Sequence, residues 1–171
     1  MKENNSRKYN FRLNPELMWG ISAKWMLHAE LFTANEQQQF NATGGSLYLK
    51  YRFYSADDIH SHFRMAVYGR GAFTNAVIHQ PAIDFNGYNS GYELGLIATK
   101  LSGKTAVSLT AGWLHAADNT SGNKFVFSNT SRNAYLYNLS IGRLMLPRSY
   151  TSYKQTNCNL MLEMLGQVNA G

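Results

Sequence analysis

The chain has 171 residues and a formal net charge of +6, and only 15% of its residues are charged against 44% hydrophobic. This length suffices for one domain with a core, and the charged fraction lies well below the roughly 25% of ordinary soluble domains. The basic residues alternate along strand-like segments, so nucleic-acid binding is not indicated. The single cysteine, Cys158, excludes an internal disulfide, and no apolar run approaches the roughly 18 to 20 residues of a membrane helix.

Strand-like alternation begins near the start of the chain. Residues 8–20 place Phe11, Leu13, Leu17 and Trp19 on one face, and Pro15 indicates an edge or a bulge, because proline cannot donate a ladder hydrogen bond. A tight turn near 21–24 leads to a second predicted strand over about 24–34. The polar residues 35–45 are interpreted as a long connection before a third strand over about 46–54, which a short turn at 55–58 ends.

The remaining segments repeat the same pattern. Strands are predicted over about 62–73, 89–100, 104–116, 131–143 and 155–166, and residues 160–165 are also compatible with a helix by composition. The loops at about 75–88 and 117–130 are long, a short turn falls at Ser102 and Gly103, and a medium connection contains Pro147. Short and long connections therefore alternate, which is typical of transmembrane barrels.

Each predicted strand has one apolar and one polar face, and no predicted helix covers the apolar faces. Such a sheet must close on itself, pack on a second sheet or face lipid. Most segments are long enough for the 9 to 11 residues of a tilted membrane strand. Aromatic residues near strand ends fit interface girdles; they are Trp19, Trp25, Tyr54, Phe73, Trp113 and Tyr135. We predict an all-β, antiparallel up-and-down transmembrane β-barrel of about eight strands, one domain over residues 1–171.

Several segments resemble outer-membrane transporter barrels of Gram-negative bacteria, nearest the meta-pathway phenol-degradation-like barrels. The residues that carry the resemblance are 44–54, the Asp57 and Asp58 turn, 60–64, 89–95 and 153–157. The resemblance implies an export signal, further strands, and a role in moving small solutes across the outer membrane. Residues 1–7 lack the apolar core of a signal peptide, and residues 167–171 lack a terminal aromatic strand. We therefore expect a mature form, or a fragment that is part of a larger barrel.

The polar face of the third and fourth strands is rich in basic residues, which would project into a barrel interior. Charges in a lumen select which solutes pass, and a basic wall favours anions. The alternative is a packed interior in which these residues pair with Glu16, Glu30, Glu93 and Glu163, since an eight-stranded barrel holds little beyond its own side chains. The candidate lumen-lining residues are Lys50, Arg52, His62, Arg64, Arg70 and Glu93.

No motif indicates catalysis, a cofactor or a nucleotide site, so an enzyme is not expected. His60 and His62 share a strand face near Asp57, and we interpret them as exposed turn residues, with a metal site as the alternative. An outer-membrane enzyme would need a Ser or His that the sequence does not single out.

Two functions remain open, and they place one set of apolar residues differently. The first is a porin-like or transporter barrel in the cell outer membrane, with membrane lipid and small solutes as partners. The second is a soluble β-barrel that binds a small apolar ligand. The following residues face lipid in the first and the interior in the second: Leu47, Leu49, Val67, Leu94, Val107 and Leu139.

Overall fold

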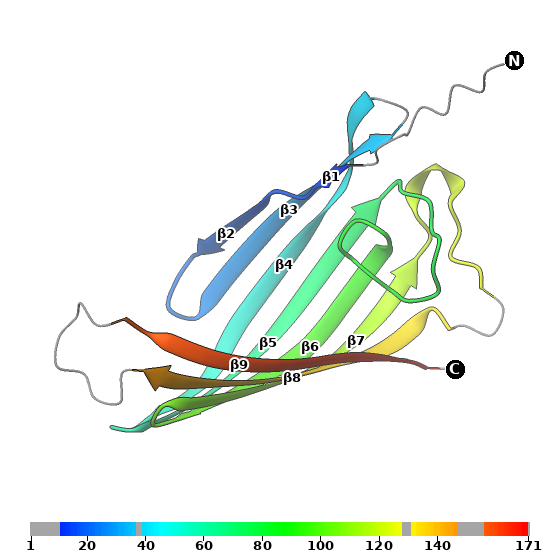
Figure 1. Ribbon diagram of the computed structural model, residues 1–171. Helices are drawn as coiled ribbons and strands as arrows, with labels where there is room; N and C mark the ends of the chain where they lie inside the picture. Colours follow the sequence, from blue (N-terminus) through cyan, green and yellow to red (C-terminus); the bar gives the residue numbers. More distant parts are fainter. Residues whose placement is uncertain (1–10, 37–38, 128–130, 147–155, 171) are drawn as a thin grey trace, which may run out of the picture.

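A computed structural model describes residues 11–36, 39–127, 131–146 and 156–170. These residues form one antiparallel up-and-down sheet, in which each long strand pairs with the next along the chain (Figure 1). The all-β, up-and-down prediction is confirmed at this level. The strands are β1 Arg12–Leu13, β2 Glu16–Gly20, β3 Trp25–Glu36, β4 Gln39–Asp57, β5 Ser61–Thr74, β6 Ser90–Ser102, β7 Thr105–Ala117, β8 Asn133–Leu146 and β9 Cys158–Asn169.

The first predicted strand is interrupted. Its described residues form β1 and β2, which both pair with β3 on either side of Asn14 and Pro15. Pro15 offers only its carbonyl, which accepts from Leu31 N at 3.1 Å. The prediction of an edge at Pro15 is confirmed, because β1 and β2 form one border of the described sheet.

The polar segment 35–45, predicted as a long connection, is mostly strand, so that prediction is wrong. The β3–β4 ladder continues to the pair Glu36 and Gln39, with a bulge between Phe32 and Thr33. Packing explains the difference, because Phe32 and Ala34 are buried and outweigh the polar composition around them. The turn predicted at 55–58 is also partly strand, since β4 runs to Asp57 and pairs with His62.

The connections differ at the two ends of the sheet. At one end, tight turns lie at 21–24, 58–60 and 103–104, while the long connections 75–89 and 118–132 lie at the other end. The predicted regular alternation of short and long connections is wrong at the β3–β4 turn. Most of the β8–β9 connection, including Pro147, lies outside the described residues. Residues 160–165 belong to β9 and are not helical.

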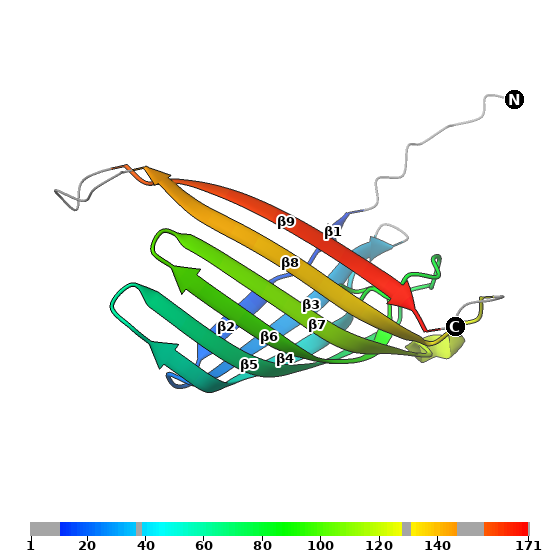
Figure 2. The ribbon, with the colours of Figure 1, turned by 90° about the horizontal axis from the view of Figure 1, so that it is seen from below.

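The sheet curves into an open trough, and the 75–89 connection lies on its concave side (Figures 1 and 2). Within the described residues, β9 pairs only with β8, while β1 and β2 pair only with β3. The closed barrel that the sequence predicts is therefore not formed by this part of the chain. Among the described residues, no helix is both long and apolar enough to cross a membrane.

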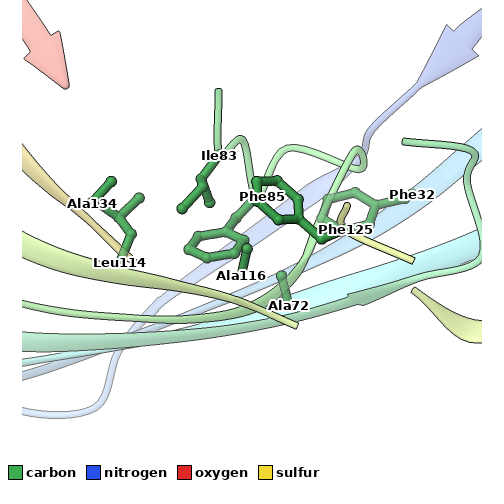
Figure 3. Packing of buried hydrophobic residues seen from close by; sticks show 8 residues of the cluster. All are labelled: Phe32, Ala72, Ile83, Phe85, Leu114, Ala116, Phe125 and Ala134. Atoms are coloured by element: carbon green, nitrogen blue, oxygen red, sulfur yellow. The ribbon is translucent and has the colours of Figure 1, made fainter. Parts of the chain in front are cut away.

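The convex face carries the apolar residues of the strands. Five of the six residues that distinguish the two functions are exposed there, with Leu94 at 54% and Leu47 at 55% relative exposure, and Leu139 is half-buried. The buried core lies instead in the trough, between the sheet and the long loops (Figure 3). It comprises Phe32, Ala72, Ile83, Phe85, Leu114, Ala116, Phe125 and Ala134.

Candidate functional site in the trough

The concave face is layered along the strands, because residues two apart on one strand share a face. On β5, Ala72 belongs to the apolar core, and Arg70, Tyr68 and Arg64 follow it toward the tight turns. The layers are an apolar cluster at the long-loop end, an ion-pair layer, an aromatic layer and a basic layer. The other members of each layer come from neighbouring strands between β2 and β9.

The ion-pair layer centres on Arg70, whose guanidinium donates to Glu30 at 2.9 Å. Both side chains are largely buried, at 18% and 15% exposure. The same guanidinium reaches Ser46 Oγ at 3.3 Å, and it reaches the 75–89 connection through Phe85 O at 3.1 Å and Asn86 Oδ1 at 3.0 Å. Arg70 therefore joins three strands to the connection that lies in the trough.

The aromatic layer is a row that crosses five strands. Its ends are carboxylates, since Glu16 lies 2.6 Å from His28 Nδ1 and Glu93 accepts from the Tyr68 hydroxyl at 2.5 Å. Between them, the rings of His28 and Tyr48 lie 4.9 Å apart, and those of Tyr48 and Tyr68 lie 5.4 Å apart. Glu93 is buried at 8% exposure, so its hydrogen bond from Tyr68 partly compensates the cost of burying a carboxyl group.

Two glycines leave room for the Tyr68 ring. A Cβ on Gly95 would lie 2.5 Å from the ring, and one on Gly112 would lie 2.7 Å from its hydroxyl oxygen. The ring therefore covers two neighbouring strands at positions without side chains. This close approach fixes the Tyr68 hydroxyl against Glu93.

The 75–89 connection, hereafter the inner loop, reaches both borders of the described sheet. Toward β1, the Arg12 guanidinium lies 4.3 Å from the centroid of the Tyr88 ring. Toward β9, the Gln167 carboxamide can exchange two hydrogen bonds of 3.2 Å with the backbone of Ile83. A cavity of about 690 Å³ lies between this loop and the sheet. The inner loop thus narrows the trough near its long-loop end.

The 118–132 connection is hydrogen-bonded to the inner loop. Asn119 is buried, and its amide donates to Ala76 O and Tyr88 O, each at 2.8 Å. Asp118 accepts from the backbone N–H of Phe125 at 3.0 Å and from Arg132 at 2.6 Å. The hydrogen bond from the Phe125 N–H and, to a lesser extent, the one from Arg132 hold the pKa of the Asp118 carboxyl below its ordinary value.

The basic layer lies nearest the tight turns. Lys50, Arg52 and Arg64 line one cavity of about 440 Å³ on the concave face, together with Lys24 from the β2–β3 turn. Arg52 donates through its side chain to Ala23 O at 2.5 Å and through its backbone to Lys24 O at 2.8 Å. These bonds hold the turn beside the cavity.

The six candidate residues of the sequence all lie on the concave face, but in different layers. Lys50, Arg52 and Arg64 share the basic cavity, while Arg70 and Glu93 lie further along the trough. His62 lies at the tight-turn end, where its Nδ1 is 2.8 Å from Asp57. In the part of the chain that the structure describes, no group of three or more His, Cys, Asp or Glu side chains could hold a metal ion.

The sequence also allowed a packed interior in which the basic residues pair with four named glutamates. Among the described residues, this pairing is found for Arg70. Among the carboxylates named for it, Glu30 pairs with Arg70, whereas Glu16, Glu93 and Glu163 bond to His28, Tyr68 and Asn138. Sequence reasoning did not nominate Tyr48, Tyr68 or the inner loop. The signal for Tyr68 was present, since the small residues Gly95 and Gly112 face it on the neighbouring strands.

Replacing Arg70 by Gln is expected to lower the free energy of unfolding by about 1–3 kcal/mol, because Glu30 would keep a largely buried charge without its partner. Chemical denaturation of the refolded protein measures the loss. In a double-mutant cycle with Glu30→Gln, a coupling of about 0.5–3 kcal/mol is expected. Additive effects of the two substitutions would contradict the role of this ion pair, and Lys100→Gln, at an exposed lysine, is the control.

Comparison with known proteins does not add to these observations. The sequence matches no protein-family model and no curated protein, and the fold matches no solved structure. The site is therefore interpreted from its own geometry.

Proposed function

We propose that this chain forms part of the wall of a transmembrane β-barrel in a Gram-negative outer membrane. Small solutes would pass along its polar concave side. One observation carries the proposal: most apolar side chains of neighbouring strands lie on the exposed convex face, while most charged and hydrogen-bonded side chains of the strands lie in the trough, beside the apolar cluster under the inner loop. Soluble barrels have the opposite arrangement, with apolar side chains inside and polar ones in water.

The apolar convex face is continuous across the strands. One register row runs from Leu27 through Leu49, Gly69, Leu94 and Trp113 to Tyr135. Soluble monomers rarely expose contiguous apolar patches larger than a few hundred Å², so a row of exposed and half-buried apolar residues that crosses six strands indicates an apolar partner. Contact with lipid chains would remove it from water without a second protein layer.

The strand lengths agree with a membrane span. The strands from β3 to β9 have 12 to 19 residues, and a tilted membrane strand needs about 9 to 11. An unpaired strand edge does not occur in the hydrocarbon region, because each unsatisfied backbone group costs several kcal/mol there. The proposal therefore requires that the β9 edge and the edge formed by β1 and β2 be paired in the membrane.

The trough supports a solute path without a catalytic step. Its basic and aromatic layers offer charge and hydrogen bonds to a polar solute. The inner loop, attached through Arg70, leaves a cavity of about 690 Å³ beside the sheet. A constriction of this kind favours small solutes. We propose a transport or channel role and assign no catalytic residue.

Folding in detergent tests the membrane proposal. Circular dichroism in detergent and in plain buffer, with gel mobility before and after boiling, is expected to give a β-rich species that needs detergent and shifts on boiling. The apparent mass of the unboiled species reports whether a second copy pairs with the open edges. A β-rich, soluble monomer in plain buffer would contradict the proposal. Solute release from vesicles that contain the folded protein then tests transport.

A further inference from the structure

The basic layer of the trough has an excess of positive charge that the carboxylates of the described residues neutralise only in part. Its cavity of about 440 Å³ is lined by Lys24, Lys50, Arg52 and Arg64, and no Asp or Glu is among the described lining residues. Concentrating four cations on one concave surface is unfavourable unless an anion shares it. The arrangement therefore calls for a ligand of opposite charge.

The strand register explains why these residues meet. Lys50 and Arg52 are two apart on β4 and so share the concave face. Arg52 pairs with Ala66 on β5, and Arg64 lies two residues before Ala66 on the same face. The β2–β3 turn, held by the Arg52 bonds to Ala23 and Lys24, closes the cavity at the border of the sheet.

One carboxylate, that of Asp57, contacts the basic layer at its rim. Asp57 lies 3.5 Å from Arg64, but it also lies 2.8 Å from His62 Nδ1, and its side chain is half exposed. Within the described residues, neither Lys50 nor Arg52 forms an ion pair with a carboxylate. Lys50 is nevertheless half-buried. One carboxylate at the rim thus leaves most of the basic charge available to a ligand.

We propose that this basic cavity, formed by Lys24, Lys50, Arg52 and Arg64, binds a small multivalent oxyanion such as a phosphate group. Guanidinium groups bind tetrahedral oxyanions with paired hydrogen bonds, and lysine adds a point charge. Thr99 also lines the cavity, and its hydroxyl lies 2.8 Å from Ser108 Oγ. The proposal deepens the transport role by naming a class of solute, and in that respect it rests on the proposed function. Phosphate binding itself requires only the folded chain.

Titration with inorganic phosphate tests the site. The full chain is refolded in a detergent without phosphorus, and binding is followed by calorimetry at low ionic strength. Saturable binding is expected, and both Lys50→Gln and Arg64→Gln are expected to weaken it about tenfold, since each removes one charge-assisted contact. Lys100→Gln removes the same charge from the convex face, where Lys100 pairs with Phe63 and Val107, and is expected to leave affinity unchanged.

Two results would overturn the proposed site. One is no saturable binding by a chain that folds as judged by its gel shift; the transport role would then stand without this ligand. The other is an equal loss of affinity in the Lys100→Gln control, which would mean that net charge alone attracts phosphate. Phosphate binding by a chain that folds without detergent would support the site and contradict the membrane role.

Discussion

Leu94→Arg is expected to lower the free energy of unfolding of the protein in lipid vesicles by about 2–4 kcal/mol, the cost of a basic side chain at the lipid face of a membrane barrel. Leu94 is 54% exposed on the convex face, between Gly69 on β5 and Trp113 on β7. If this face contacted water, the same substitution would remove exposed apolar surface. Denaturant titration of the protein in vesicles measures the change.

The matched control is Thr110→Arg on the neighbouring strand. Thr110 faces the trough, where it pairs with Ile97 and Asn138 and lines the cavity beside the inner loop. An arginine there meets a polar interior and is expected to cost much less than at Leu94. Equal costs at the two positions, or a gain at Leu94, would contradict a lipid-facing convex surface.

Gly95→Val is expected to lower the free energy of unfolding by about 2–4 kcal/mol, the sum of overpacking and of a weakened buried hydrogen bond. The new Cβ would lie 2.5 Å from the Tyr68 ring, so the ring would have to move from its position against Glu93. Glu93, at 8% exposure, would then lose its hydroxyl donor. Chemical denaturation under the same conditions measures the effect.

Gly71→Val provides the comparison for this substitution. Gly71 lies in β5 on the convex face, and no atom of the described residues would come within 4 Å of a new Cβ there. Valine favours the strand conformation more than glycine, so Gly71→Val is expected to be neutral or stabilising. If Gly95→Val were equally tolerated, Tyr68 would not depend on the close approach over β6 and β7.

The strand segments could be predicted because alternation is a local property of the sequence. The pattern from His62 to Phe73 places Arg64 and Arg70 on one face and Val67 on the other, as the structure does. The extension of the β3–β4 hairpin through residues 35–45 could not be predicted in this way. It depends on the burial of Phe32 and Ala34, which is a tertiary effect.

The trough could be predicted only in part. A basic concave wall follows from the alternation of Lys50, Arg52 and Arg64 along β4 and β5. The inner loop has no periodic signal, so its return into the trough and its attachment to Arg70 were not foreseen. Closure of the sheet was predicted because an apolar face recurs from strand to strand and no predicted helix covers it, but closure depends on what pairs with the two edges rather than on any local pattern.

The most direct test of a lipid-facing convex surface uses the tryptophans of the chain. All three, Trp19, Trp25 and Trp113, lie on the convex face by strand register, so their fluorescence reports on this face alone. In vesicles of lipids brominated along the acyl chain, the folded protein is expected to show strong quenching and weak quenching by aqueous acrylamide. Strong acrylamide quenching without an effect of the brominated lipids would show that the face contacts water, and would contradict the proposed membrane barrel.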